Sequence, residues 1–542
     1  MQISDRTQAP ASPPPSGAAR PARPCLAAQD DAALVHGRLG HWAAQRPSRP
    51  ALTLDAHGPN CRTLNFAQLH DLVEAHARQL HQHAAPATRL LDARQDPLAQ
   101  LVDFLGTIRS GRCAAMADPA WPDALHARVA ARLPPGPATP HGQRPAHTSA
   151  SPGTGLAPEQ HMPTDPDSPF YIGFTSGSTG LPKGFRRSHR SWTESFRVSL
   201  TDLGVEAGDT VMAPGRLSHS LFLFGALLAL WNGGGAWLQS RFSAGATLRT
   251  LAGGKINTLI CVPSQLLMML SAARQRRLRP LPAPRLILIS GARWPADQTP
   301  ALQALFPAAR ILCFYGASET SYISWMPAHA DAAPQAVGRP FSNLQLHIGP
   351  DPRQPAHPAG QPGLIWVRSP MLFIDYVNTD DQTAATRIDD WLSVRDVGHL
   401  DVDGILHLDG RENRMIVSQA RNIFPEEVET RLHAHPAIAH ASLHGLTDPQ
   451  RGAVVHAVIR WQPPARAPDQ TGLPAHPGSR QLARWCEQQL ERYKTPRHWW
   501  VWQGDWPSTA SGKTDHEVIR QALVQMLADA APPPPPGAPR QA

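Results

Sequence analysis

The stretch Tyr171-Ile-Gly-Phe-Thr-Ser-Gly-Ser-Thr-Gly-Leu-Pro-Lys-Gly184 is the most informative part of the 542-residue sequence. Its apolar start, 170–174, predicts a buried strand, and a loop of small and hydroxyl residues follows before a single lysine. Glycines let backbone N–H groups approach a ligand closely, hydroxyls add donors, and the lysine adds a mobile positive charge. These properties predict a phosphate-binding loop made of Thr175, Ser176, Gly177, Ser178, Thr179, Gly180 and Lys183.

This loop differs from the Walker A loop of P-loop NTPases, which has glycine directly before its lysine and serine or threonine directly after it. Here Pro182 precedes the lysine and Gly184 follows it. A second segment, Ser511-Gly-Lys-Thr514, has the Gly-Lys-Thr ending, but Pro507 stands where the first glycine belongs. Neither segment supports a P-loop NTPase.

Short apolar runs alternate with helical patterns around the loop. We expect strands over 170–174, 256–262, 285–289 and 310–314, and helices over 31–45, 66–83, 97–109, 218–231, 264–274 and 298–306. Such alternation predicts parallel sheets covered on both faces. After about residue 410 the pattern changes, with helices expected over 425–433, 479–491 and 515–528. The predicted fold class is α/β: a large N-terminal domain of parallel-type sheets with helices on both faces, plus a small C-terminal α+β lid domain.

Composition sets the expected domain limits. Residues 1–30 are rich in Pro, Ala, Ser and Arg without the apolar core of a secretory signal, and are expected to be a disordered tail. Residues 31–411 form the large N-terminal domain in this prediction, and residues 412–529 form the lid. The Pro/Gly-rich stretch 134–169 is expected to be a flexible connection, and 530–542 a Pro-rich tail.

Charge and cysteine usage exclude several classes of protein. The net charge of +8 comes from scattered arginines without interleaved aromatics, which does not predict nucleic-acid binding. No apolar run reaches the roughly 18–20 residues that a transmembrane helix needs. The six cysteines stand singly, which predicts neither a zinc site nor a disulfide framework and favours a reducing cytoplasm: Cys25, Cys61, Cys113, Cys261, Cys313 and Cys486.

Further along the chain, the motifs resemble those of the adenylate-forming superfamily, which includes acyl-CoA synthetases, adenylation domains and luciferases. The resemblance covers roughly residues 31–528 and is greatest to acyl-CoA ligases. Besides the loop at 175–184, it rests on six segments in the family's order: Tyr315-Gly-Ala-Ser-Glu-Thr320, Arg395-Asp-Val-Gly-His-Leu-Asp401, Gly410-Arg411, Asn422-Ile-Phe-Pro-Glu-Glu-Val-Glu429, Tyr493-Lys-Thr-Pro496 and Pro507-Ser-Thr-Ala-Ser-Gly-Lys513.

The resemblance implies the role of each residue in binding ATP. The loop from Thr175 to Lys183 would hold the β- and γ-phosphates, and Glu319 would hold Mg²⁺ together with phosphate oxygens. Thr320 would contact the α-phosphate. The backbone near Gly291, together with Tyr315, would frame the adenine, and Gly316 would also belong to the ATP site. Asp396 and Arg411 would bind the ribose hydroxyls. Lys513, Thr175 and Glu319 would be the catalytic residues, with Lys513 stabilising the charge that develops during adenylation.

The sequence departs from the family's pattern at three places. Val394-Arg395 precedes the ribose aspartate where many members have Thr-Gly. The usual aspartate pair of the hinge is Asn413-Arg414 here, which makes Asn413 the hinge residue. Ala420 takes the place of the glycine that lines the pantetheine tunnel in members that use CoA. None of these changes removes a phosphate or metal contact.

The segment from His219 bounds the substrate. Amino-acid-activating members place an aspartate in this helix, whereas here it reads His-Ser-Leu-Phe-Leu-Phe-Gly-Ala-Leu-Leu without an acid. A buried ammonium without a counter-charge is costly, which argues against an α-amino acid. A pocket edged by Phe222, Phe224 and Gly225 would suit an acyl chain or aryl group. His219 either gates this pocket or caps the helix.

These features predict an AMP-forming acyl-CoA synthetase, an acid–thiol ligase that uses ATP, Mg²⁺ and CoA and acts on a fatty or aryl acid. One alternative is an enzyme that transfers the adenylate to the phosphopantetheine of an acyl carrier protein. A second alternative is a non-catalytic member that only binds nucleotide.

Overall fold

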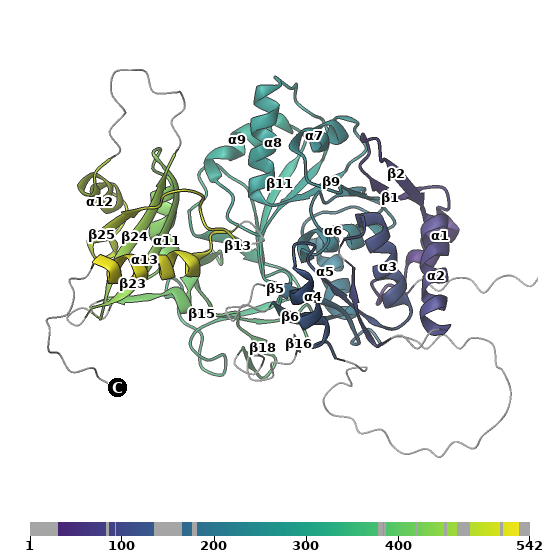
Figure 1. The fold of residues 1–542 in the computed structure, drawn as a ribbon, viewed down its shortest axis with the longest axis horizontal. Coiled ribbons are helices and arrows are strands. Elements are labelled where there is room, and N and C mark those ends of the chain that lie inside the picture. The colour runs from purple at the N-terminus through teal and green to yellow at the C-terminus, as the bar shows by residue number, and fades with distance from the viewer. Residues whose placement is uncertain are drawn as a thin grey trace, which may run out of the picture.

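The structure is a computed structural model with a large N-terminal part and a smaller C-terminal part, drawn in green and yellow (Figure 1). The described residues are 31–82, 86–92, 94–134, 165–175, 182–377, 383, 386–418, 421–448, 452–462, 477–509 and 513–530. Several predicted segments lie outside these ranges: residues 1–30, most of the connection at 134–169, residues 176–180, Ala420, and all of the C-terminal tail except Ala530. No helix within them is long and apolar enough to cross a bilayer.

The largest sheet has fifteen strands among the described residues, in the order β17-β18-β15-β19-β20-β13-β12-β11-β10-β9-β7-β8-β1-β2, with β14 beside β15. Its parallel part is β1 (Pro50–Leu54), β7 (Val211–Met212), β8 (Ala236–Leu238), β9 (Thr258–Cys261), β10 (Leu286–Ile289) and β11 (Arg310–Tyr315). The four strands predicted from apolar runs all form, three of them in this parallel part.

The other strands of this sheet pair antiparallel, which the apolar runs did not predict. They are β2 (Arg62–Asn65), β12 (Ser324–Pro327), β13 (Ala336–Pro340), β14 (Gln345–Ile348), β15 (Gly363–Arg368), β17 (Arg387–Ile388), β18 (Trp391–Leu392), β19 (Asp396–Leu400) and β20 (Leu406–Arg411). These strands are short and mostly half-buried, so they carry weak apolar runs.

A second sheet has the order β16-β6-β5-β4-β3 and carries the predicted phosphate loop. Its strands are β3 (Thr88–Leu91), β4 (Cys113–Met116), β5 (Pro169–Thr175), β6 (Lys183–Ser188) and β16 (Asp375–Tyr376). Strands β3, β4 and β5 are parallel, whereas β6 pairs antiparallel with both β5 and β16. Pairing with β16 brings a segment nearly 200 residues away to the edge of the phosphate loop.

The helices of the N-terminal part pack against both sheets. They are α1 (Leu39–Gln45), α2 (Phe66–Gln82), α3 (Pro97–Arg109), α4 (Asp123–Ala130), α5 (His189–Thr201), α6 (Ser220–Trp231), α7 (Ala244–Ala252), α8 (Pro263–Gln275), η1 (Ala296–Gln298) and α9 (Thr299–Leu305). Helix α3 begins where predicted because Asp96 accepts hydrogen bonds from Leu98 N and Ala99 N, and Pro97 suits the first helical position.

Helix α1 begins eight residues later than predicted. Residues 31–37 instead form turns, and Asp31 N donates to Gly37 O at 3.4 Å. A Cβ at Gly37 would lie 2.1 Å from Asp31 O, so the glycine permits this close approach.

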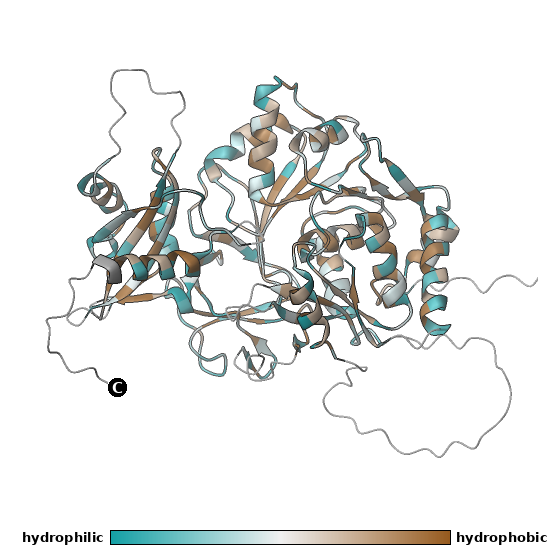
Figure 2. Cartoon of the chain, in the orientation of Figure 1, coloured by the Kyte–Doolittle hydropathy of each residue, from teal (hydrophilic) through white to brown (hydrophobic). Residues whose placement is uncertain are grey.

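The N-terminal part has two hydrophobic cores, and the side chains of β10 point alternately into one and the other. Leu286 and Leu288 pack into the core shared with α5 and α6, whereas Ile287 and Ile289 pack into the core under α7, α8 and α9. Figure 2 shows the corresponding pattern, with hydrophobic residues concentrated on the strands and on much of the helix α6 between the two sheets. Helices thus cover both faces of the parallel part, as predicted.

The C-terminal part has its own three-stranded sheet, β23-β24-β25, and a two-stranded hairpin. Its elements are η2 (Glu412–Arg414), β21 (Ile416–Ser418), β22 (Arg421–Ile423), α11 (Pro425–His433), β23 (Ile438–Asp448), β24 (Gly452–Trp461), α12 (Ser479–Glu487), η3 (Arg492–Lys494), β25 (His498–Val501) and α13 (His516–Ala530). The predicted helix over 479–491 ends early, at Glu487. Separate clusters of buried side chains lie beneath α11 with α12 and beneath α13.

Candidate active site

The ends of the predicted phosphate loop meet across two paired strands. Thr175 ends β5 and Lys183 begins β6, and the two residues are register partners. The Thr175 hydroxyl donates to Lys183 O at 3.5 Å. The loop between them is outside the described residues, so the roles of Ser176, Gly177, Ser178, Thr179 and Gly180 remain predictions.

Lys183, Tyr376 and Glu319 form one cluster beside the loop. Lys183 Nζ lies 3.1 Å from the centroid of the Tyr376 ring, and the Tyr376 hydroxyl donates to Glu319 Oε1 at 2.7 Å. Burial lowers the pKa of Lys183, while the negative charge of Glu319 raises it. Sequence reasoning missed Tyr376, because only the pairing of β16 with β6 brings it to the site.

A tight turn after β11 presents Glu319. The Thr320 hydroxyl is fully buried and accepts a hydrogen bond from Ala317 N at 3.0 Å. A Cβ at Gly316 would lie 1.8 Å from the carbonyl oxygen of Ser321, so this turn requires glycine. The structure therefore gives Thr320 and Gly316 roles in shaping the turn, beside their predicted contacts with ATP.

The predicted ribose residues lie together on β19 and β20. Asp396 and Arg411 are cross-strand partners, and Arg411 Nε is 3.1 Å from Asp396 Oδ1. Asp396 is only 3% exposed, and its other oxygen accepts a short hydrogen bond from the Tyr315 hydroxyl. Burial, and then the Asp396 charge, raise the pKa of Tyr315 well above its ordinary value. The carboxylate is thus held in one orientation from two sides.

Gly291 follows the end of β10, next to β11. Its φ of +87° is in the region that favours glycine. The preceding Ser290 donates to Phe314 O at 2.9 Å and ties this turn to the strand that ends at Tyr315. The predicted adenine-binding residues therefore lie on neighbouring strands.

Lys513 comes from the C-terminal part and meets the N-terminal part at the same place. Partial desolvation lowers the pKa of Lys513, the charge of Arg411 lowers it further, and Asp396 raises it. The charge of Lys513 in turn lowers the pKa of His219. Lys513 is therefore close to both the ribose residues and the start of α6.

The four predicted pocket residues separate into two groups. Phe224 packs among core aromatic rings, 5.3 Å from Trp192 and 5.0 Å from Phe196 between ring centroids. Gly225 allows close packing of α6, since a Cβ there would lie 3.0 Å from that of Ala213. Both are explained by packing alone, and their contact with substrate remains a prediction.

His219 and Phe222 lie at the N-terminal end of α6, with ring centroids 6.3 Å apart. His219 is the N-cap residue, but its side chain makes no capping hydrogen bond. The cap interpretation therefore loses its support, and the gating interpretation remains. Burial lowers the pKa of His219, which keeps the imidazole neutral at pH 7.

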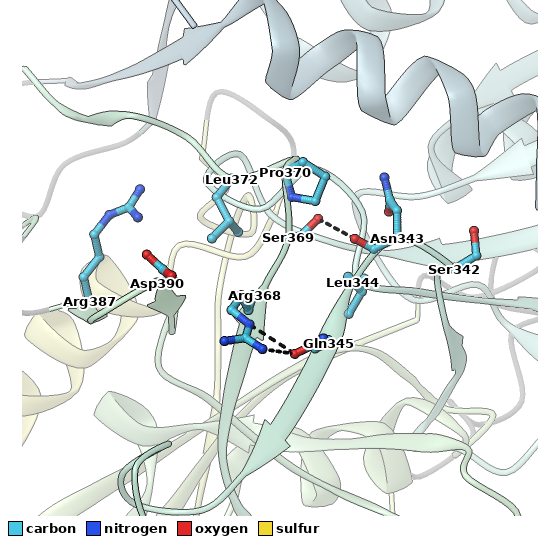
Figure 3. Close-up of a pocket in the computed structure, with 10 residues that line it drawn as sticks. All are labelled: Ser342, Asn343, Leu344, Gln345, Arg368, Ser369, Pro370, Leu372, Arg387 and Asp390. Carbon is cyan, nitrogen blue, oxygen red and sulfur yellow. Dashed lines mark hydrogen bonds between the residues drawn. The ribbon is translucent and has the colours of Figure 1, made fainter. Parts of the chain in front are cut away.

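Two surface cavities lie apart from these residues. One, of about 510 Å³, is lined by polar residues of β14 and β15, including Gln345 and Arg368 (Figure 3). The other, of about 680 Å³, lies between the N-terminal part and the hairpin β21–β22. Neither lining includes a predicted nucleotide-binding residue.

Comparison with known proteins agrees with this geometry. The sequence profile "AMP-binding enzyme" matches residues 129–377, and "AMP-binding enzyme C-terminal domain" matches residues 427–513. A Bacillus subtilis protein named as the uncharacterized acyl-CoA ligase YhfT is 38% identical over 369 residues, which cover 68% of this chain and 71% of the relative. The chain belongs to the AMP-binding enzyme family.

Other relatives support the same membership. The indoleacetate–CoA ligase of Aromatoleum aromaticum is 30% identical over 66% of this chain and 68% of its own length. The o-succinylbenzoate CoA synthetase of Bacillus subtilis, solved with its acyl-adenylate intermediate, has a TM-score of 0.71 at 22% identity, covering 89% of this chain and 97% of its own. The predicted adenylate-forming family, its two-part fold and the class of AMP-forming acid–thiol ligases are confirmed.

Proposed function

We propose that this AMP-binding enzyme activates an apolar carboxylic acid, fatty or aryl, with ATP and transfers the acyl group to CoA. The observation that carries this proposal is the position of Lys513. Its charge interacts with those of Asp396 and Arg411 and with that of His219, although all three belong to the other part of the chain. A cation placed between a ribose site and an apolar helix suits the attack of a carboxylate on a nucleotide phosphate.

The described residues fit ATP and Mg²⁺. Glu319 offers one carboxylate, and no group of three or more metal-binding side chains occurs in the described part of the chain. A single carboxylate completed by phosphate oxygens is typical of Mg²⁺ sites. When bound, Mg²⁺ neutralises phosphate charge, and Glu319 would hold it. Lys183 would bind the outer phosphates, and Asp396 and Arg411 the ribose.

The first half-reaction joins two anions, so positioning and charge neutralisation dominate its catalysis. The acid's carboxylate oxygen attacks the α-phosphorus, the bond to the bridging oxygen breaks, and pyrophosphate leaves. Lys513 would stabilise the charge that builds on the α-phosphate oxygens. His219, neutral at pH 7, would border the acid without adding a charge.

The substrate proposal rests on the character of α6. Ten of its twelve residues are buried and none is charged. One carboxylate, Asp118, acts on His219, but it is already paired with Arg216 at 3.5 Å. An α-amine would therefore lack a free counter-charge among these residues. Relatives named indoleacetate–CoA ligase and feruloyl-CoA synthase support an aryl acid.

CoA is the proposed acceptor because the relatives are CoA ligases, and none of them supports a carrier protein. Thioester formation would follow rotation of the C-terminal part about Asn413. Ion pairs flank this residue on both sides: Glu412 with Arg395 at 2.5 Å, and Arg414 with Glu429 at 2.6 Å. The rotation would thus be confined to Asn413. The tunnel role of Ala420 remains a prediction.

The proposed domains are residues 31–411 and 412–529, with the boundary at these ion pairs. A reducing compartment such as the cytoplasm is also proposed. It is supported by the five cysteines of the described residues, which are all free thiols. Burial raises the pKa of Cys113 to about 12, which keeps that thiol protonated and unreactive.

A matched pair of acids tests the substrate proposal. 3-Phenylpropanoate and phenylalanine carry the same ring and differ in the α-amine, and ATP–pyrophosphate exchange measures the activation of each. We expect kcat/KM for phenylpropanoate to be higher by at least about 100-fold, because the amine would be buried without a partner. A preference for phenylalanine would contradict the proposal. The same assay with a fatty acid and with an indole acid measures which substrate shape the enzyme prefers.

A further inference from the structure

The strand that leaves the phosphate loop carries a buried arginine. Arg187 on β6, within the arginine-rich segment 186–190, is only 1% exposed. Burying a guanidinium is costly unless its donors are satisfied. Burial indeed lowers the pKa of Arg187 to about 9, which still leaves it charged at pH 7.

The donors of Arg187 converge on the turn that carries Glu319. Nη1 donates to Ser318 O at 2.8 Å, and Nη2 donates to Ser321 Oγ at 2.6 Å. These two acceptors stand on either side of Glu319 and Thr320 in the sequence. Nη2 also donates to Met371 O at 2.7 Å. One planar guanidinium therefore holds both ends of the turn against β6.

The segment after Met371 completes the support of Glu319. Phe373 N donates to the backbone oxygen of Glu319 at 2.8 Å, and the Tyr376 hydroxyl donates to its Oε1 at 2.7 Å. The preceding residue on β6, Arg186, pairs with Asp375 and fixes the strand that bears Tyr376. Adjacent residues of β6 thus support Glu319 in two ways: Arg187 bonds directly to its turn, and Arg186 fixes the strand that carries Tyr376.

The charge of Arg187 lacks a directly bonded anion, since its described acceptors are carbonyl and hydroxyl oxygens, including Ser191 at the start of α5. Glu319 is the carboxylate whose charge acts on it. A buried cation beside a carboxylate attracts it and helps to hold it in one place. An apolar residue would fill the same space without this effect.

We propose that Arg187 is a positioning residue for magnesium, which fixes the direction of the Glu319 carboxylate and supplies the buried positive charge behind it. It thereby sets the gain in ATP affinity that Mg²⁺ provides. This inference rests on the proposed function, because ATP with Mg²⁺ is the ligand that Glu319 would meet. Its test, however, needs no carboxylic acid.

The test compares ATP binding with Mg²⁺ and with EDTA by titration calorimetry of the full chain. We expect Arg187→Met to reduce the Mg²⁺-dependent gain in ATP affinity by at least about tenfold, with a much smaller change in EDTA. Arg187→Lys keeps the charge but loses the fork geometry, and should recover part of the gain. Arg190→Met is the matched control, because Arg190 pairs with Asp167 on the surface.

Two results would overturn the proposal. One is an equal loss of ATP affinity with and without Mg²⁺ in Arg187→Met, which would indicate a merely structural role. The other is a wild-type protein whose ATP affinity does not depend on Mg²⁺. If Arg187→Met does not fold, Ser321→Ala provides the test instead, because it removes one acceptor of the Arg187 guanidinium. We expect this variant to lose Mg²⁺-dependent ATP affinity selectively as well, but by a smaller factor. Failure to adenylate any acid would contradict the proposed function and leave this binding comparison valid.

Discussion

Single buried charges determine the chemistry of this enzyme. Asp396 is held by Tyr315 and Arg411, and Arg187 is held by the turn around Glu319. Each is a charged side chain whose burial is stabilised by several hydrogen bonds, and such groups are costly to leave unpartnered. Lys513 differs, because the charges of Arg411 and Asp396 act on it and its ammonium group makes no ion pair with another described residue, which leaves it available for an anionic ligand.

Lys513→Ala tests this role at the residue scale. We expect the rate of adenylation to fall by at least about 100-fold, because the variant loses the cation that would stabilise the negative charge developing on the α-phosphate. The rate at which a preformed acyl-adenylate is converted to the thioester should change little, since no pyrophosphate is displaced in that step. Rapid-quench assays of the two half-reactions measure each effect. Equal losses in both half-reactions would contradict the assignment, and the exposed Lys255→Ala serves as the control.

At the scale of elements, the turn after β11 shows how backbone geometry controls the site. Gly316→Ala places a methyl group 1.8 Å from the expected position of Ser321 O, so the turn must open. We expect affinity for ATP with Mg²⁺ to fall by about tenfold or more while the melting temperature falls by only a few degrees. Gly478→Ala is the control, because a Cβ there meets nothing within 4 Å. Unchanged ATP binding in Gly316→Ala would contradict this account.

The packing of β23 against α13 predicts acid sensitivity of the C-terminal part. Ser442 Oγ lies 2.8 Å from His444 Nε2 and 2.7 Å from His516 Nδ1. Burial, reinforced by the charge of Arg414, lowers the pKa of both histidines to about 4, although Glu429 opposes this. Between their ordinary value of 6.5 and about 4, the unfolded chain therefore binds more protons than the folded chain, and stability falls as pH falls.

The expected loss is at most about 3 kcal/mol for each histidine across that range. Urea unfolding at pH 7 and pH 5, followed by tryptophan fluorescence, measures it. His516→Gln should make the free energy of unfolding less dependent on pH, whereas His329→Gln, at an exposed position, should leave the dependence unchanged. A free energy of unfolding that stays constant from pH 7 to pH 5 would contradict this prediction.

Local signals predicted some elements well and others poorly. The helix over 97–109 was predicted to the residue because its cap and its first proline are adjacent in the sequence. The antiparallel strands from β12 to β20 were missed because they are short and half-buried. Tyr376 and the role of Arg187 could not be predicted, since the contacts that define them join residues 57 and 131 positions apart. Motif resemblance singled out Thr175 with Lys183 and Asp396 with Arg411, and the structure pairs the members of each couple, while their roles toward ATP stay predictions.

At the scale of the whole molecule, two half-reactions require two arrangements of the C-terminal part. In the described arrangement the charges of Arg411 and Asp396 act on Lys513, as the proposed adenylation step needs. Ion pairs of Glu412 and Arg414 flank Asn413, the proposed pivot. Asn413→Pro should therefore retain adenylation and lose thioester formation from preformed adenylate by at least about tenfold, because proline fixes φ.

The matched control is Val402→Pro, which places proline in an exposed turn of the same region, where Val402 is 90% exposed and Gly404 N donates to Asp401 O. Stopped-flow and quench measurements of each half-reaction distinguish the two variants. Equal activity of Asn413→Pro in both half-reactions would place the pivot elsewhere.

The most direct test of the central claim is mass spectrometry of the products formed from ATP, Mg²⁺, CoA and an apolar acid. The account predicts that the wild-type enzyme forms acyl-CoA and AMP in equal amounts, and that omission of CoA leaves acyl-adenylate bound to the protein. Acyl-adenylate that persists in the presence of CoA, with no thioester formed from any fatty or aryl acid, would contradict the assignment as an acyl-CoA ligase.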